Sequence, residues 1–304
     1  MKRRHFVKST LISSVALPNL TAQADGSITE LNPFKLKFAP HLGMFKHHAG
    51  EDPIDQINFM ADQGFSAYED NNMMRREVSL QESIGKTLAD RNMTMGVFVT
   101  GRVKSDGRPV LPGNHEDLRT AFLASIRASI DVAKRVNATW MTVVPGRQDF
   151  QLKMGYQTSN VIELLKRACE LLEPHGLVMV LEPLNFFNHP GYFLTEIPQA
   201  YQICKAVDSP SCKILFDIYH QQIQEGNIIP NIEEAWDEIA YFQIGDNPGR
   251  KEPTTGEINY PNIFKFIYGK GYRGVLGMEH GNFHPGRDGE AKLIEAYRSV
   301  DLMD

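Results

Sequence analysis

The sequence is short of the features that mark several classes of protein. Its 304 residues include three cysteines, Cys169, Cys204 and Cys212, in no CxxC or zinc-finger spacing, so we expect buried thiols rather than a disulfide framework. No stretch approaches the ~20 apolar residues that span a bilayer. The formal net charge is −5, whereas nucleic-acid binding calls for a basic surface. We therefore expect no nucleic-acid partner and no membrane-spanning segment.

The first 24 residues, MKRRHFVKSTLISSVALPNLTAQA, have the organisation of a secretory signal. A basic head precedes a short apolar stretch and a small-x-small ending at residues 22–24. The Arg3-Arg4 pair resembles the start of a twin-arginine export signal, and a disordered basic tail is the alternative. Removing the segment takes away four basic residues and no acid, which changes the net charge from −5 to −9. We predict a periplasmic or otherwise exported protein, with residues 25–304 as one mature domain that is free of the membrane.

From about residue 35, short apolar runs alternate with longer amphipathic segments. The amphipathic segments include residues 116–136 and 158–176; in the second, Thr158 and Ser159 are candidate caps and Gly176 is a stop signal. The length and the β-branched or aromatic content of the apolar runs suit strands that are buried on both faces. These runs occupy residues 35–39, 65–69, 93–100, 139–144, 177–182, 213–219, 239–244 and 274–279.

Eight strand candidates, each followed by a helix-like segment, predict an α/β fold, a parallel sheet closed into a (β/α)8 TIM barrel. The competitor is an open doubly wound sheet, which usually has a glycine-rich phosphate turn after its first strand. The corresponding segment here, APHLGMFKHHAG at residues 39–50, is no G-x-G-x-x-G motif. With no linker or break in composition, a single domain is the simplest interpretation.

Polar residues end the last four predicted strands. They are Glu182, Asp217, Gln243 and Glu279, at successive spacings of 35, 26 and 36 residues that suit one strand–helix unit per step. The carboxyl ends of barrel strands meet at one mouth, where three carboxylates would repel one another unless a cation lay between them. Oxygen ligands favour Mg²⁺ or Mn²⁺ over zinc, with Co²⁺ as a further candidate. Each carboxylate taken singly could instead be a helix cap.

Three further residues are candidates for contact with a substrate at this mouth. His220 lies just past its strand, where it could donate a hydrogen bond beside the metal or simply begin a helix. Glu69 closes the second predicted strand and His41 closes the first. A loop rich in glycine, proline and charge, residues 242–264, then follows the seventh strand, where it is either a connector or the rim of an active site.

Four segments resemble the hydroxypyruvate isomerase group of the xylose-isomerase-like TIM-barrel superfamily, which also contains the ketose 3-epimerases. The segments are LEPLN, FDIYHQQIQEGN, FQIGDNPGRKEPTTGEINY and GMEHGNFHPG. The similarity is densest between residues 178 and 282. The loops that follow the first, second and fourth strands match the familiar pattern poorly, so the resemblance leaves the substrate open.

The resemblance implies a role for each matching residue. Glu182, Asp217, Gln243 and Glu279 would hold a divalent metal, and no organic cofactor would be needed. Glu182 and Glu279 would also act as the catalytic acid and base. His220 and Arg250 would contact substrate oxygens, and Glu257 would order the loop or its arginine. The loop after strand seven would then be a substrate clamp.

The expected reaction is proton transfer through a metal-stabilised enediolate, which interconverts a small keto or aldo sugar acid or sugar. Either glutamate could remove the proton. A ketose 3-epimerase, or a dehydratase or lyase with the same metal site, is the main alternative. An apurinic endonuclease and a non-catalytic sugar-binding protein are further alternatives. Related barrels form homodimers or tetramers, so a homo-oligomer is a candidate assembly.

Overall fold

The computed structural model describes residues 32–302, so the predicted export signal lies outside the described residues. Within this range nine short strands alternate with helices. The strands are β1 (Lys37–Ala39), β2 (Ala67–Tyr68), β3 (Thr94–Met95), β4 (Phe98–Val99), β5 (Trp140–Val143), β6 (Val178–Leu181), β7 (Cys212–Asp217), β8 (Ile239–Gln243) and β9 (Val275–Gly277). The α-helices are α1 (Lys46–Ala49), α2 (Pro53–Asp62), α3 (Val78–Asp90), α4 (Glu116–Val136), α5 (Met154–Leu172), α6 (Ile197–Val207), α7 (Ile218–Gln224), α8 (Ile228–Glu234), α9 (Tyr260–Gly269) and α10 (Gly286–Val300).

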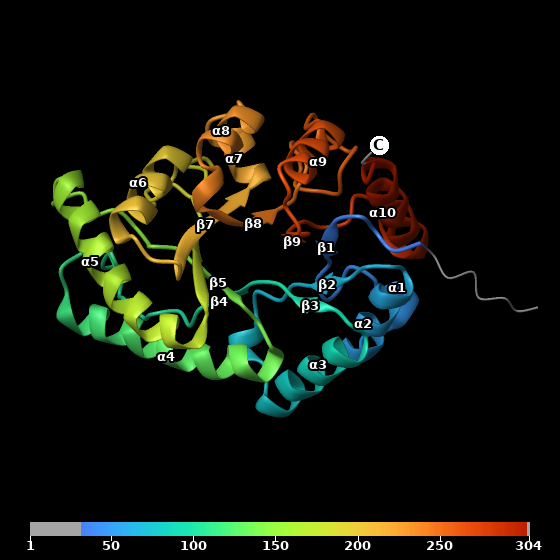
Figure 1. Ribbon diagram of the computed structural model, residues 1–304, viewed down its shortest axis with the longest axis horizontal. Coiled ribbons are helices and arrows are strands. Elements are labelled where there is room, and N and C mark those ends of the chain that lie inside the picture. The colour runs from blue at the N-terminus through green and yellow to red at the C-terminus, as the bar shows by residue number, and fades with distance from the viewer. Residues whose placement is uncertain (1–31, 303–304) are drawn as a thin grey trace, which may run out of the picture. The chain divides into compact units, whose positions relative to one another are not determined.

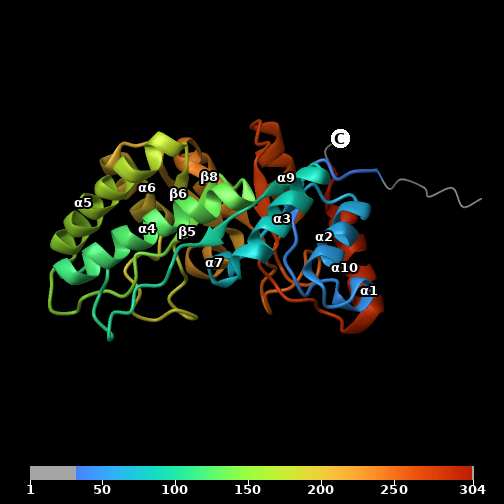
Figure 2. The same ribbon diagram turned by 90° about the horizontal axis from the view of Figure 1, so that it is seen from below.

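The strands form the curled parallel sheet of a TIM-barrel-like fold, as the alternation predicted. Seven strands pair in the order β1-β9-β8-β7-β6-β5-β4, and β2 pairs with β3. All pairings are parallel. Helices surround the strands in Figure 1, and Figure 2 shows the same layer from below. The carboxyl ends of all the strands therefore open at one end of the barrel.

The third predicted strand, residues 93–100, is two strands. Its first part, β3, pairs with β2, and its second part, β4, pairs with β5. Gly96 lies at the break, where a Cβ atom would come within 2.3 Å of the Tyr241 hydroxyl. The close approach of this side chain requires glycine at position 96, and the strand changes partner there.

The helices agree with their sequence patterns, with one correction. The segment 116–136 is α4, and Gly176 ends the second segment with a positive φ of 63°. The prediction that Thr158 and Ser159 cap that segment is wrong, because α5 begins four residues earlier, at Met154. Their hydroxyls donate to the carbonyls of Met154 and Gly155 inside the helix. Serine and threonine often make this bond within helices as well as at caps, so their presence does not fix a helix start.

The core lies between the strands and the helix layer. It includes large, fully buried aromatic side chains such as Phe38, Phe216 and Phe242, each from a strand. The three cysteines are buried free thiols, as predicted. Within residues 32–302 no helix has the length and apolar character needed to cross a membrane.

Candidate active site

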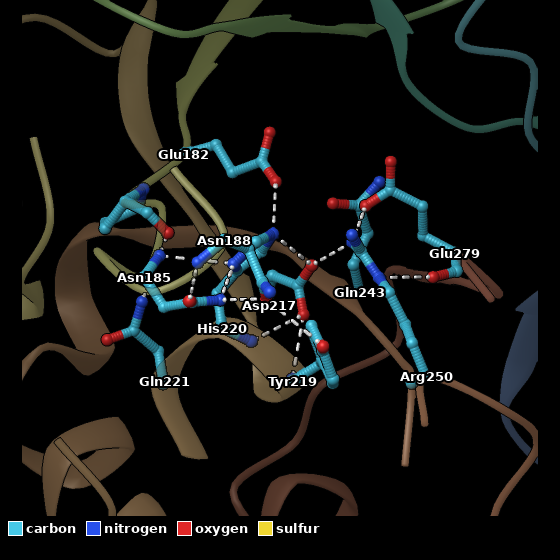
Figure 3. A network of polar contacts seen from close by, with 12 residues as sticks. Glu182, Asn185, Asn188, Asp217, Tyr219, His220, Gln221, Gln243, Arg250 and Glu279 are labelled. Carbon is cyan, nitrogen blue, oxygen red and sulfur yellow. Dashed lines mark hydrogen bonds and ion pairs between the residues drawn. The ribbon is translucent and has the colours of Figure 1, made fainter. Parts of the chain in front are cut away.

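The carboxyl ends of β6 to β9 bring four predicted site residues to one end of the barrel. Glu182 follows β6 directly, Asp217 and Gln243 are the last residues of β7 and β8, and Glu279 lies two residues beyond β9. Figure 3 shows Glu182 on one side of Asp217, and Gln243 and Glu279 on the other. The strand pairing explains this arrangement, because Asp217 is in register with Gln243, and Gln243 with Gly277.

Asp217 is held in place by the start of the next helix. It is the N-cap of α7, and its Oδ1 accepts hydrogen bonds from the backbone N–H groups of Tyr219 and His220 at 2.8 and 3.3 Å. Its Oδ2 is left to face the other site residues. The Asp217 carboxylate therefore both caps a helix and contributes an oxygen to the site. A strand-end acid can thus be a helix cap and a site residue at the same time.

His220 is buried with its proton on Nε2. Its Nδ1 accepts from the backbone N–H of Asn185 at 3.2 Å and lies 2.6 Å from Nδ2 of the same residue, so Nδ1 carries no hydrogen. Nε2 lies 3.6 Å from Asp217 Oδ2 and 3.8 Å from Glu182 Oε1. Burial lowers the pKa of His220 to about 4, which keeps the ring neutral. The side chain can therefore donate one hydrogen bond toward the carboxylates.

Arg250 reaches into the site from the loop after β8. Its Nη2 donates to Asp217 Oδ2 at 2.9 Å and to Glu279 Oε2 at 2.6 Å, and its Nε donates to the Glu279 carbonyl at 3.0 Å. The guanidinium lies over the Tyr219 ring, 4.8 Å from the centroid. Burial lowers the pKa of Arg250, but the attraction of Asp217, Glu279 and Glu182 outweighs this effect. The net result is a raised pKa. Arg250 therefore stays charged between two of the carboxylates.

Mutual repulsion and burial make these carboxylates reluctant to ionise together. Burial raises the pKa of Glu182 well above its usual range, and Glu279 and Asp217 raise it further. Burial also raises the pKa of Glu279 to about 7, although Arg250 opposes the change. Raised pKa values of this kind are typical of catalytic acids and bases that work near neutral pH.

Gln243 has a buried amide oxygen that is unpartnered among the described residues. Its amide nitrogen donates to Glu69 Oε1 at 2.9 Å, and Glu69 Oε2 accepts from the Tyr241 hydroxyl at 2.8 Å. Space for the Glu69 carboxylate comes from Gly277, where a Cβ would lie 1.8 Å from Oε2. Glu69 therefore fixes which amide atom of Gln243 is bonded and which is free.

The donor atoms suit a hard divalent cation. A buried oxygen without a partner is costly, and a cation would satisfy it. When they are ionised, Glu182, Asp217 and Glu279 carry three negative charges, and Arg250 compensates one of them. Within residues 32–302 the only cluster of three metal-binding side chains is Glu182, Asp217 and His220, with ligand atoms within 4.8 Å of one another. Because Nε2 of His220 holds its proton, the free oxygen of Gln243 is the better fourth ligand.

Two candidates for substrate contact, Glu69 and His41, and the predicted loop residue Glu257 lie away from the cavity. Glu69 is fully buried behind Gln243, and both of its oxygens are engaged. His41 contacts the carbonyls of Leu42 and His280 and lines a separate hollow. Glu257 is exposed, and it accepts from Asn247 at 2.8 Å and from Gln222 at 3.3 Å, as expected of a residue that orders the loop. None of the three lines the cavity beside the carboxylates.

Other polar residues of the site were not identified from the sequence, although Asn185 and Asp246 lie within the segments that resemble the hydroxypyruvate isomerase group. Asn71 donates to Glu279 Oε1 at 2.7 Å, and Asn185 orients His220. Asp246 is fully buried and accepts from the backbone N–H groups of Asn247, Gly256 and Ile258, which fixes the loop that carries Arg250. Asparagine and aspartate are so common in loops that only the proximity to Arg250 could have indicated Asp246.

A cavity of about 470 Å³ opens beside these groups. Glu182, His220, Arg250 and Glu279 contribute to its wall, together with the loops after β4, β5 and β6. A small-molecule pocket of this size lies within the usual range of ~300–1,000 Å³. The cavity thus gives a substrate access to the carboxylates of Glu182 and Glu279, the neutral imidazole of His220 and the guanidinium of Arg250.

Comparison with known proteins identifies the family. The model of the xylose isomerase-like TIM barrel matches residues 57–300. The chain belongs to this family. It is 34% identical over 190 residues to the hydroxypyruvate isomerase of Escherichia coli (strain K12), an alignment that covers 62% of this chain and 70% of that protein. It is 29% identical over 250 residues to the 2-oxo-tetronate isomerase of Cupriavidus necator, covering 80% and 92%. The resemblance to the hydroxypyruvate isomerase group is therefore confirmed, and these relatives identify an isomerase-type enzyme.

Solved structures support the same fold. An AP endonuclease of family 2 from Brucella melitensis superposes with a TM-score of 0.74 and 25% identity, covering 86% of this chain and 98% of that one. The D-psicose 3-epimerase of Clostridium cellulolyticum H10 superposes with a TM-score of 0.70, 17% identity and coverage of 87% and 96%. At 17% identity the second likeness concerns the fold alone.

Proposed function

We propose that the protein is a metal-dependent isomerase that interconverts a keto and an aldo form of a sugar acid or sugar. The observation that carries this proposal is the cluster of three strand-end carboxylates around Arg250, with the free oxygen of Gln243 beside them. The names of the relatives, hydroxypyruvate isomerase and 2-oxo-tetronate isomerase, support the reaction class. Glu182, Asp217, Gln243 and Glu279 would hold Mn²⁺ or Mg²⁺.

A cation held there supplies positive charge that stabilises the negative charge developing on the substrate oxygens. The rest of the chemistry belongs to side chains. One glutamate carboxylate, Glu182 or Glu279, removes a proton from the hydroxyl-bearing carbon of the substrate and leaves an enediolate. Transfer of the hydroxyl proton to the former carbonyl oxygen and return of a proton to the former carbonyl carbon together give the isomer. The raised pKa values of both glutamates suit a group that accepts a proton and then gives it back.

His220 and Arg250 orient the substrate. The Nε2–H group of His220 donates to a substrate oxygen, and its low pKa keeps it a neutral donor rather than an acid. Nε and Nη2 of Arg250 hold the guanidinium on Asp217 and Glu279, so Nη1 is the nitrogen that can donate to a substrate oxygen. The loop of residues 244–259, fixed by Asp246, holds this guanidinium in place.

Product analysis separates this reaction from its neighbours. The purified protein with Mn²⁺ would be incubated with hydroxypyruvate or 2-oxo-tetronate, and the products examined by NMR and mass spectrometry. A product of unchanged mass, with the carbonyl group on the adjacent carbon, supports an isomerase. A product that differs only in configuration indicates an epimerase. Loss of water or a shortened carbon chain indicates a dehydratase or lyase and contradicts the proposal.

We also propose that the protein is exported after folding. The support is the twin-arginine pattern within residues 1–24. In a host with twin-arginine export, N-terminal sequencing of the periplasmic protein should show that this segment has been removed. Full-length protein confined to the cytoplasm would contradict export, and an Arg3→Lys, Arg4→Lys double variant is the matched control.

A further inference from the structure

The charges that line the cavity are unevenly distributed. Among the described residues of its wall, Glu182 and Glu279 are the only carboxylates. The loops after β4 and β5, residues 100–111 and 144–147 of the wall, contribute three arginines and no acid. The cavity therefore combines one acidic sector, where we place the reaction, with one basic sector.

The basic sector lies next to the acidic one around the barrel. Strand β4 pairs with β5, and β5 pairs with β6, so the three loops leave neighbouring strands at the same end. Arg102 lies three residues beyond β4, and Arg147 lies four residues beyond β5. Glu182 directly follows β6. A ligand that extends from Glu182 across the neighbouring loops therefore meets Arg147 and Arg102.

Two of the three arginines carry a charge that no acid compensates. Arg108 is neutralised by Asp117 through two hydrogen bonds of 3.1 and 2.7 Å. Arg147 donates to the carbonyl of Pro190 at 3.2 Å, and its guanidinium lies 5.5 Å from the centroid of the Tyr192 ring, so its partners position it but carry no negative charge. Arg102 is exposed and makes no hydrogen bond or ion pair within residues 32–302.

The size of the cavity bears on the length of the substrate. A volume of about 470 Å³ is typical of pockets for drug-sized ligands, and a three- or four-carbon acid would fill only a small part of it. The rings of His189 and Tyr192 also line the wall, and such rings pack well against the apolar face of a sugar.

We propose that the substrate is an anionic sugar derivative of more than four carbons. Its carbonyl and neighbouring hydroxyl lie at Glu182 and Glu279, and its far end, a carboxylate or a phosphate, binds between Arg102 and Arg147. Arginine suits either anion, because its fork donates two parallel hydrogen bonds to carboxylate or phosphate oxygens. This inference rests on the proposed function, because it extends the same site.

The test compares matched neutral and charged six-carbon ligands. Binding of D-fructose and D-fructose 6-phosphate, and of D-glucose and D-glucuronate, would be measured by calorimetry with Mn²⁺ present. The proteins are the wild type, Arg102→Gln, Arg147→Gln and the control Lys104→Gln, which changes an exposed residue of the same loop that does not line the cavity. In the wild type and the control, at least one charged ligand should bind roughly tenfold or more tightly than its neutral partner.

The preference should fall to about twofold or less in Arg102→Gln or Arg147→Gln. Tighter binding of the phosphate ester or of the uronate then tells which anion the sector takes. Equal binding of charged and neutral partners by the wild type overturns the inference, and so does a preference that survives in both arginine variants. Failure of both charged ligands to bind, whether or not hydroxypyruvate and 2-oxo-tetronate do, overturns it as well.

Failure of the inference can be told apart from failure of the proposed function. If the charged ligands bind through the two arginines but no sugar acid is isomerised, the basic sector stands and the isomerase proposal fails. If hydroxypyruvate or 2-oxo-tetronate is isomerised while Arg102→Gln and Arg147→Gln bind every ligand as the wild type does, the isomerase proposal stands and the basic sector has no role in binding.

Discussion

Gln243 and Glu69 show how a side chain behind the site can control the chemistry of one inside it. A side-chain amide has a nitrogen that donates hydrogen bonds and an oxygen that accepts them. Only the oxygen can bind a cation. The bond from Gln243 Nε2 to Glu69 leaves that oxygen free. The Tyr241 hydroxyl holds Glu69 in turn, so residues of β8 and the residue that follows β2 together fix the oxygen that would bind a cation.

Replacement of Glu69 by leucine should weaken metal binding without touching the carboxylates. Without its acceptor, the Gln243 amide can turn its nitrogen toward the site, so we expect the Kd for Mn²⁺ to rise roughly 10- to 100-fold. Glu69→Gln keeps an accepting oxygen and should retain most of the affinity, and Glu51→Gln, at an exposed site, is the control. Calorimetry with Mn²⁺ measures the effect. A Kd unchanged in Glu69→Leu would contradict this role.

Glu182→Gln and Glu279→Gln should each lower kcat by roughly 10²- to 10⁴-fold, because each removes a group that can hold the transferred proton. The variants should stay folded, since glutamine has nearly the same shape and removes a repulsive charge. Initial rates on the true substrate and a circular dichroism spectrum test both points, with Glu234→Gln at an exposed position as the control. Near wild-type turnover in both variants would exclude glutamate-mediated proton transfer.

At the scale of elements, the sequence predicts strands and their terminal residues well and loop geometry poorly. All eight apolar runs contain strands, because burial on both faces leaves a continuous apolar pattern. The end of each run also located Glu182, Asp217, Gln243 and Glu279. The partner change at Gly96 and the orientation of Glu69 depend on contacts with Tyr241, which is 145 and 172 residues away in the chain. No local pattern encodes such contacts.

The conformation of the loop after β8 depends on the buried Asp246 more than on the exposed Glu257, the residue that the sequence analysis named. Asp246→Ala removes the acceptor of three backbone N–H groups, and we expect KM to rise about tenfold as Arg250 loses its position. The free energy of unfolding should fall by about 1–3 kcal/mol. Steady-state kinetics and urea unfolding measure the two effects, with Asp131→Ala on the exposed face of α4 as the control. An unchanged KM would show that the loop does not depend on Asp246.

For the molecule as a whole, the buried carboxylates of the site make the stability of the metal-free protein depend on pH. The pKa values of Glu279 and Glu69 rise from 4.5 to about 7 and about 8, with burial as the first cause. The folded state therefore binds more protons than the unfolded state at neutral pH, and its stability falls as pH rises. The lowered pKa values of His220 and His280 act in the opposite sense, and this contribution fades as pH rises above the unfolded-state pKa of 6.5.

The melting temperature of chelator-treated protein should accordingly decline between about pH 6.5 and pH 8. In this window both histidines are neutral in the folded state and lose most of their protons in the unfolded state, so the carboxylates make the larger contribution to the pH dependence. Mn²⁺ should flatten the decline, and Glu279→Gln should reduce it without metal. Scanning calorimetry at a fixed salt concentration measures the slope. A melting temperature that rises across this window would contradict the assigned repulsion.

The most direct test of metal-dependent proton transfer is hydrogen exchange, followed by NMR in D₂O. The protein would be loaded with Mg²⁺, which causes no paramagnetic broadening, and mixed with hydroxypyruvate, 2-oxo-tetronate or a six-carbon sugar acid. We predict deuterium uptake at a carbon next to the carbonyl, its loss on treatment with a chelator, and its absence from Glu182→Gln and Glu279→Gln. Exchange that persists after chelation, or in both variants, would contradict the central claim.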